Sequence, residues 1–257
     1  QGDCFVRKGT QQDPMTRNDI VKIFKNKTSN NFEDNVKIGF IDTDYSKKIK
    51  LSTLEKEELP SDRAENEIKR IIAKKENGNY NRIDGFLGGF SLTNSYENFS
   101  IEELENKLKN AKDDYKDEDW FELFDNSYSI NLEILNEDKN YIEDATFKLE
   151  IPDLDSLHVF YKFHEDPSAV IRLQLEKMNS FNPRLRNYPD VIKNKNKIIV
   201  RAEIGDIKHF IPTNIYKEPF RLWINSNLSG ETLEMRGILY GKNLAEPIKK
   251  SFFIEVK

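Results

Sequence analysis

The spacing of the hydrophobic residues changes after residue 126, and this change limits the possible folds more than any other feature. Before it, apolar residues such as Ala64 and Ile68 recur every three to four positions, which is typical of a helix with one buried face. After it, apolar residues such as Phe147 and Leu149 alternate with polar ones, which is typical of strands. The sequence therefore predicts an α+β protein, with a mixed α/β N-terminal part followed by an antiparallel Ig-like β-sandwich.

Several runs after residue 126 share the two-residue period and are separated by Asn, Gly or Pro turns. The apolar side chains on one face of each strand should fill the core between two sheets. Residues 167–196 lack this pattern and are expected to form a long irregular connection, a kind of insert that is often functional. The residues expected in the core include Phe147, Leu149, Ile151, Val200, Leu222 and Ile254.

Helix start signals are concentrated in the first half of the chain. Ser100 and Glu103 have the spacing of a capping box, in which each residue hydrogen-bonds the other's backbone N–H, so a helix is expected to begin there. Other helices are predicted over residues 60–75 and 16–25. The run DWFELF at 119–124 either extends the Ser100 helix or forms a separate helical turn.

Charge is distributed unevenly along a chain whose net charge is only −5. Residues 101–166 contain 20 acidic and 7 basic side chains, whereas residues 167–257 contain 16 basic and 9 acidic ones. Such asymmetry is compatible with two partner surfaces, and equally with a solvated acidic helix face beside ordinary surface lysines.

Cys4 is the one cysteine of the chain, so no disulfide can form within it. A reducing compartment fits this composition best, and we expect a cytoplasmic protein. No apolar run approaches the roughly 18 residues that a membrane-spanning helix needs, so no membrane contact is expected.

Two stretches resemble parts of a known bacterial family. The first runs from an aromatic-x-Arg-x-Gly-Thr sequence through a polar loop to a Thr-Arg helix start, and it is similar to the final strand and helix of the AlbA-like, Schlafen-related DNA-binding domain. The second, residues 134–152 and 229–256, resembles the Ig-like sandwich that follows that domain, although Asp138-Lys-Asn replaces the usual Gly-Thr turn. The residues that match the first stretch are Phe5, Arg7, Gly9, Thr10, Thr16, Arg17 and Ile20.

The resemblance implies the C-terminal portion of a larger protein with three parts. Residues 1–30 would end the AlbA-like DNA-binding domain, residues 31–125 would form a mixed strand/helix connecting region, and residues 126–257 would form the antiparallel sandwich. The expected function is that of a non-enzymatic accessory region whose sandwich contacts a protein partner or holds an oligomer together. The alternative is part of a Schlafen-like nuclease effector in phage defence, with its catalytic acids upstream of this chain.

The candidate nucleic-acid contact consists of Arg7, Lys8, Gly9 and Thr10. An arginine can grip a phosphate with two N–H groups, and a Gly-Thr turn offers a backbone N–H and a hydroxyl. Most of this assignment comes from the resemblance, and an ordinary strand end with exposed basic residues is the competing interpretation. The basic connection at 182–197 is a second possible contact surface.

The sequence holds no catalytic constellation, and neither a metal nor another cofactor is expected. His158 and His164 are six residues apart on one expected strand face, whereas a catalytic zinc needs three convergent ligands. Phe220, Trp223 and Tyr240 are expected to pack in the core or on a sheet face rather than to stack on bases. A third possible function is that of a sandwich that binds a carbohydrate or another ligand. This hypothesis predicts an exposed aromatic cluster on one sheet face.

Overall fold

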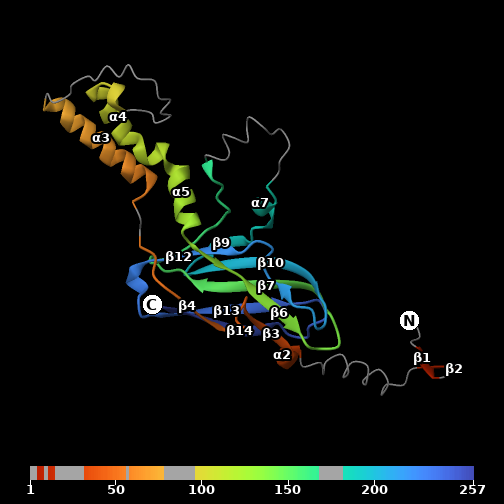
Figure 1. Ribbon diagram of the computed structural model, residues 1–257. Helices are drawn as coiled ribbons and strands as arrows, with labels where there is room; N and C mark the ends of the chain where they lie inside the picture. Colours follow the sequence, from red (N-terminus) through yellow and green to blue (C-terminus); the bar gives the residue numbers. More distant parts are fainter. Residues whose placement is uncertain (1–4, 9–10, 15–31, 56–57, 78–95, 168–181) are drawn as a thin grey trace.

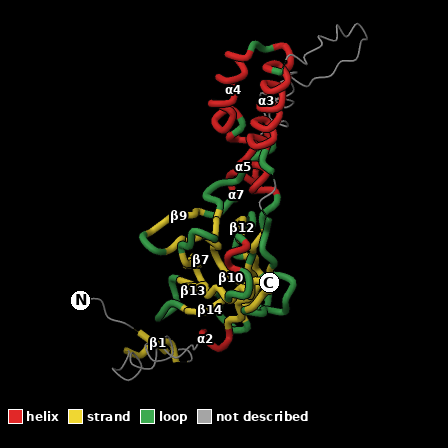
Figure 2. Tube along the Cα trace, turned by 90° about the vertical axis from the view of Figure 1, so that its left-hand side faces the viewer, coloured by secondary structure: helices red, strands yellow, loops and turns green. Residues whose placement is uncertain are grey.

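The computed structural model describes residues 5–8, 11–14, 32–55, 58–77, 96–167 and 182–257. Figure 1 shows two layers of strands, from which an arm made of the helices α3, α4 and α5 projects. The view turned by 90° in Figure 2 shows the same arm extending away from the sheets. The predicted α+β class is therefore confirmed.

The larger layer is a six-stranded sheet in which the order of strands is β4-β14-β13-β7-β10-β9. All of its pairs are antiparallel except β14 and β4, which are parallel. The described strands from residues 126–257 thus pair antiparallel, as predicted, and the parallel pair is added by β4, which comes from the preceding region. A long connection that includes the helical arm separates the two strands, so no tight turn imposes an antiparallel pair. The bounds are β4 (Lys48–Leu51), β7 (Ile142–Pro152), β9 (Asp190–Asn194), β10 (Lys197–Ile207), β13 (Thr232–Tyr240) and β14 (Ile248–Val256).

The second layer consists of two three-stranded sheets, with strand orders β11-β6-β3 and β5-β12-β8. One apolar core contains residues from all three sheets, so the layers bury their facing surfaces against each other. All six side chains that the sequence placed in the core are buried there. The bounds are β3 (Val36–Phe40), β5 (Tyr128–Ile130), β6 (Leu132–Asn136), β8 (Leu157–Val159), β11 (Thr213–Asn214) and β12 (Phe220–Ile224).

Strands from before residue 126 take part in both layers. β3 pairs with β6, and β4 forms the edge of the six-stranded sheet beside β14. A short helix, α2 (Phe32–Asn35), precedes β3. The sheets of the sandwich therefore draw on the region at 31–125, which the sequence assigned to a connecting role.

The helical arm has a small core of its own. Ile68 and Ile71 of α3 pack with Leu104 of α4, and all three side chains are buried. The capping box is confirmed, because the Glu103 carboxylate accepts from Ser100 N (2.7 Å) and Ser100 Oγ accepts from Glu103 N (3.2 Å). The DWFELF run lies in a separate helix. The bounds are α3 (Pro60–Glu76), the 3₁₀ turn η1 (Tyr96–Asn98), α4 (Ile101–Asp114) and α5 (Lys116–Asp125).

The connection expected to be irregular at 167–196 contains regular structure in its described part. A short helix, α7 (Pro183–Asn187), is followed by β9, which pairs with β10 at the sheet edge. Only Val191 of β9 is buried, so no alternation marked this edge strand in the sequence. The helix predicted at 16–25 lies outside the described residues. A further 3₁₀ turn, η2 (Ser226–Leu228), precedes β13.

No helix in the described part of the chain is long and apolar enough to cross a membrane.

Candidate functional site

The predicted nucleic-acid contact is divided between described and undescribed residues. Arg7 and Lys8 lie on β1 (Phe5–Lys8), which forms an antiparallel hairpin with β2 (Gln11–Pro14). Gly9 and Thr10, between the two strands, lie outside the described residues. The hairpin pairs with no other described strand. The role of these four residues therefore stays a prediction.

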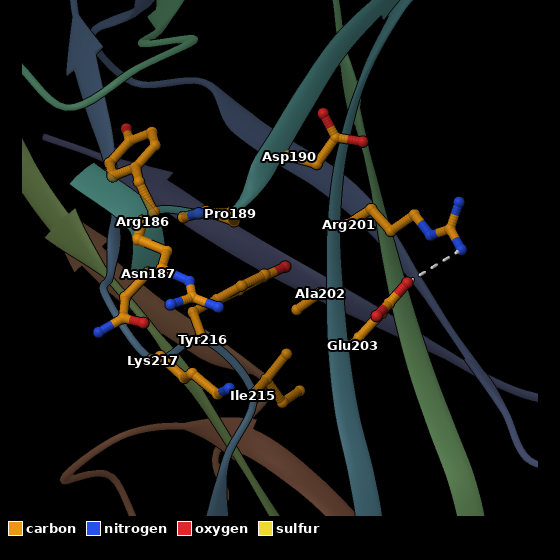
Figure 3. A pocket seen from close by; sticks show the side chains of 11 residues that line it. Arg186, Asn187, Pro189, Asp190, Arg201, Ala202, Glu203, Ile215, Tyr216 and Lys217 are labelled. Carbon is orange, nitrogen blue, oxygen red and sulfur yellow. Dashed lines mark ion pairs between the residues drawn. The ribbon is translucent and has the colours of Figure 1, made fainter. Parts of the chain in front are cut away.

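A cavity opens between α7, β10 and the segment that follows β11, and it is called the α7 cavity below. Its volume is about 360 Å³. Figure 3 shows residues from these distant parts of the chain around one space. A backbone hydrogen bond joins two of its walls, because Glu218 N donates to Asn187 O (3.3 Å). The lining residues used below are Arg186, Asp190, Arg201, Glu203, Tyr216 and Lys217.

Among the lining residues, Tyr216 is buried together with its polar hydroxyl group. Its side chain is 1% exposed, and its hydroxyl has no hydrogen-bond partner. The backbone on either side is fixed, because Asn131 Oδ1 accepts from Tyr216 N (3.1 Å) and Asn131 Nδ2 donates to Tyr216 O (2.9 Å). The ring packs edge-on against Phe220 at 5.5 Å. Burial raises the pKa of the Tyr216 hydroxyl, so it remains protonated at neutral pH.

Charged groups of both signs line the α7 cavity. Arg186 and Lys217 lie on one side, Asp190, Arg201 and Glu203 lie on the other, and the Tyr216 side chain extends toward Ala202 of β10 (Figure 3). Arg201 is 3.9 Å from Glu203, so these two charges partly offset each other. The sequence pointed to the basic connection that contains Arg186, but no local signal marked Tyr216.

The two histidines come together around an aromatic side chain of the arm. His158 lies on β8 and His164 lies beyond its end, so the expected shared strand face is wrong. Both rings lie against Trp120 of α5, with centroids at 5.3 Å and 5.8 Å. Burial lowers the pKa of His158, and burial together with the charge of Lys162 lowers the pKa of His164. The neutral imidazoles therefore act as packing groups.

Phe124 extends this contact and anchors α5 to the sandwich. Its ring meets Phe160 at 5.3 Å and Phe163 at 5.0 Å, both edge to face. The guanidinium of Arg221, on β12, lies 5.1 Å from the Phe124 ring centroid. Arg221 Nη1 also donates to Ser127 O (2.9 Å), just after α5. Aromatic packing and one cation–π contact thus join the helical arm to the sheets.

A third feature lies at the end of the sandwich nearer α2. Tyr141, His209, Phe210 and Ile211 form what is called the loop-end cluster below. Tyr141 is 46% exposed, Phe210 62% and Ile211 52%. The His209 ring stacks on Tyr141 at 5.3 Å and meets Phe210 at 5.9 Å.

The backbone holds the loop-end cluster in place. Phe210 N donates to Asn136 O (2.7 Å), and the buried Asn136 side chain in turn hydrogen-bonds residues 138 and 140. Phe210 has a φ of 54°, a left-handed conformation that costs energy for a bulky residue. The loop-end cluster lies on loops, whereas the hypothesis of a carbohydrate-binding sandwich predicts an exposed aromatic cluster on a sheet face. Of the other aromatic residues considered from sequence, Phe220 is buried and Tyr240 is 40% exposed at the end of β13.

Comparison with known proteins gives no family for this chain. No family model matches it, and no curated protein matches it. AvmM, which catalyses macrocyclization in alchivemycin A biosynthesis, is similar over 50% of this chain and 80% of its own, with 9% identity and a TM-score of 0.26. The collagen adhesin of S. aureus is similar over 51% of this chain and 44% of its own, with 13% identity and a TM-score of 0.24. At these scores, neither likeness indicates a shared fold.

Proposed function

We propose that the chain is a non-enzymatic interaction region of a bacterial AlbA-like DNA-binding protein, and that its sandwich contacts another protein. The observation that carries the proposal is the loop-end cluster. Tyr141, Phe210 and Ile211 are exposed on loops, the His209 ring contacts both Tyr141 and Phe210, and Phe210 N is hydrogen-bonded to Asn136 O of β6. Contiguous exposed apolar groups of this kind mark interaction surfaces, and aromatic anchors commonly supply most of the binding energy.

The charges beside the cluster are balanced. Glu143, Asp144 and Asp206 are exposed on the neighbouring strand ends, and Lys139, Lys208 and Lys242 are exposed among them, with Lys242 Nζ 4.0 Å from the Asp144 carboxylate. A polar rim with charges of both signs around exposed apolar groups suits a protein partner better than an anionic lipid surface. The left-handed Phe210 supports the same proposal, because a fixed loop loses less entropy on binding.

A photo-crosslinking residue placed at Phe210 tests the proposal in cells that produce the protein natively. Leu185 on α7 is a matched control position, since it is exposed to 46% and lies away from the cluster. We expect position 210 to capture one defined protein that position 185 does not. The purified partner should then bind the 257-residue chain, with affinity about tenfold or more lower for Phe210→Ser, as for a central interface anchor. Leu185→Ser should leave the affinity unchanged.

The proposal would be contradicted if Phe210→Ser and Leu185→Ser changed the affinity for the purified partner by the same factor. A captured protein that proves to be a second copy of this chain would replace a separate partner with self-association. In that case, Phe210→Ser should lower the molar mass measured by light scattering.

The proposed nucleic-acid contact belongs to the intact N-terminal domain and rests on the resemblance of residues 5–20. The chain alone contributes Arg7 and Lys8, at the end of β1, and a net charge of −5. We expect its Kd for duplex DNA or RNA to be no lower than about 10⁻⁴–10⁻⁶ M at about 150 mM salt. A longer protein with the complete domain should bind more tightly, and Arg7→Glu should weaken its binding to all sequences alike. Fluorescence anisotropy with a labelled duplex measures the Kd of the chain alone and of the longer protein. A nanomolar Kd for the chain alone would contradict the assignment to Arg7 and Lys8 and would indicate that the basic connection at 182–197 makes the contact.

A further inference from the structure

We propose that the free edge of β4 binds an extended peptide segment, in which apolar and acidic residues alternate, as an added β-strand. The site is a groove between β4 and β5, called the β4 groove below, with a volume of about 630 Å³. It shares no residue with the loop-end cluster and does not depend on the protein contact proposed above. The lining residues used below are Asp42, Lys48, Ile49, Lys50, Leu51, Tyr128 and Ile130.

The backbone groups of β4 point alternately toward β14 and toward the groove, as in any parallel pair of strands. Phe253 N donates to Lys47 O (2.8 Å), and Lys257 N donates to Leu51 O (2.8 Å). The odd-numbered residues of this segment therefore turn their N–H and C=O groups toward β14. The residues that turn these groups toward the open edge are Lys48, Lys50 and Ser52.

Two hydroxyl groups occupy the ends of this open edge. Ser46 Oγ accepts from Lys48 N (3.1 Å) and donates to Lys48 O (2.9 Å). The Tyr128 hydroxyl accepts from Ser52 N (3.1 Å) and donates to Ser52 O (3.0 Å). No described residue bonds the outward N–H and C=O of Lys50, which lie between these two hydroxyls. One donor and one acceptor are therefore open to a strand from outside, which is the template for strand addition.

The inner face of β4 indicates which side chains an added strand would bury. Ile49 and Leu51 are half-buried and pack against the core of the sandwich. Ile130, in the opposite wall of the groove, is buried. Neighbouring strands place adjacent side chains on the same face of a sheet, so every second residue of the added strand would lie beside Ile49 and Leu51. These residues are expected to be apolar.

The outer face of β4 indicates the charge of the remaining side chains. Lys48 and Lys50 are exposed there. Toward β14, Lys50 is 3.7 Å from Glu255 and Lys48 lies 5.7 Å from the Phe253 ring centroid, whereas no described strand lies on their open side. The lining also contains Asp42, which follows β3 on the other wall. Opposite charges on adjacent strands attract, so acidic residues are favoured beside the lysines, and the lysines of a second copy's β4 would be repelled.

The test is a titration of the ¹⁵N-labelled 257-residue chain, followed by NMR, with the capped peptide Glu-Val-Glu-Val-Glu as the probe. We expect saturable shifts of the amide signals of β4, β14 and β5 at peptide concentrations up to about 5 mM. The charge-reversed peptide Lys-Val-Lys-Val-Lys is the control and should leave these signals unchanged.

Two methylated versions of the probe separate strand addition from charge attraction. One carries methyl groups on the backbone nitrogens of its three Glu residues, and the other on those of its two Val residues. With Glu beside Lys50, an antiparallel strand donates to Lys50 O from a Glu N–H, and a parallel strand donates from a Val N–H. At least one version should therefore lose binding, and a version that still binds identifies the direction of the added strand.

Lys50→Pro tests the site from the side of the protein. Proline is tolerated at an edge where the N–H faces outward, and this variant removes both the open N–H and the charge. We expect the Kd for the probe to rise about tenfold, the effect of losing one hydrogen bond and one opposite charge. Lys249, exposed on β14 outside the part that pairs with β4, is the matched control, and Lys249→Glu should leave the Kd unchanged.

Lys50→Glu keeps the N–H but reverses the charge, so it should also raise the Kd, and it gives an independent measure if Lys50→Pro perturbs folding. The proposal is overturned if the probe shifts none of these signals or if the charge-reversed peptide binds equally well. It is also overturned if neither methylated version loses affinity, or if Lys50→Pro and Lys50→Glu both bind the probe as the wild type does.

Discussion

Replacing Leu149 with Ala should lower the free energy of unfolding of the sandwich by about 2–5 kcal/mol, as for the truncation of a fully buried leucine. Leu149 is 0% exposed and lies in the middle of β7, between β10 and β13. Its partner on β13 is Gly237, where the Phe147 and Phe252 rings already occupy the space that a side chain would fill. These rings already fill the space opposite Gly237 and have little freedom to move into a new void, so we expect a value in the upper part of this range.

Urea unfolding followed by circular dichroism measures this change. Glu143 is the matched control, since it lies on the same strand and its side chain is exposed. Glu143→Ala should alter the free energy of unfolding by no more than about 0.5 kcal/mol. An equally small effect of Leu149→Ala would contradict the register of β7, because a shift of one residue turns every side chain to the opposite face.

The features that the sequence predicted well are those set by neighbouring residues. The alternation around Phe147 and Leu149 reports which face of one strand is buried, and it requires no knowledge of the partner strand. The capping box at Ser100 is similarly local, because both of its hydrogen bonds join residues three positions apart. For this reason the α+β class, the core strands and the start of α4 could be predicted from spacing alone.

The features that the sequence did not reveal depend on contacts between distant residues. The parallel pairing of β4 with β14 joins strands about 200 residues apart, and the short β4 carries no sign of its direction. The edge strand β9 buries only Val191, so its pattern resembles that of a polar loop. Tyr216 belongs to the same class, because only the folded chain shows that its hydroxyl is buried without a hydrogen-bond partner among the described residues.

The candidate sites show the same division. Arg186 lies in a basic connection that composition alone could single out, whereas its proximity to Lys217 requires the fold. His158 and His164 were expected six residues apart on one strand face, whereas in the structure both rings pack against Trp120 of α5, a contact that the sequence did not indicate. Sequence patterns thus show where charged and aromatic side chains lie along the chain, and the packing of the fold determines which of these side chains come into contact.

Replacing Phe124 with Ala should release the helical arm from the sandwich, at a cost of about 3–5 kcal/mol in the free energy of docking. Phe124 is 2% exposed and contacts Phe160, Phe163 and Arg221 from the sandwich side. The loss includes the buried area of the ring, two edge-to-face contacts and one cation–π contact. The arm retains its own small core around Leu104, so we expect α3 and α4 to remain paired after release.

Hydrogen exchange measured by mass spectrometry separates docking from folding of the arm. Phe124→Ala should speed exchange in α5 and around β8, while the central strands β7 and β10 keep their protection, because local opening does not require global unfolding. Leu104 is the matched control, since it is 0% exposed but belongs to the separate core of the arm. Leu104→Ala should speed exchange in α3 and α4 and leave β8 unchanged. If both variants gave the same pattern, arm and sandwich would form one cooperative unit, and the cluster around Phe124 would be an ordinary part of a single core rather than a joint.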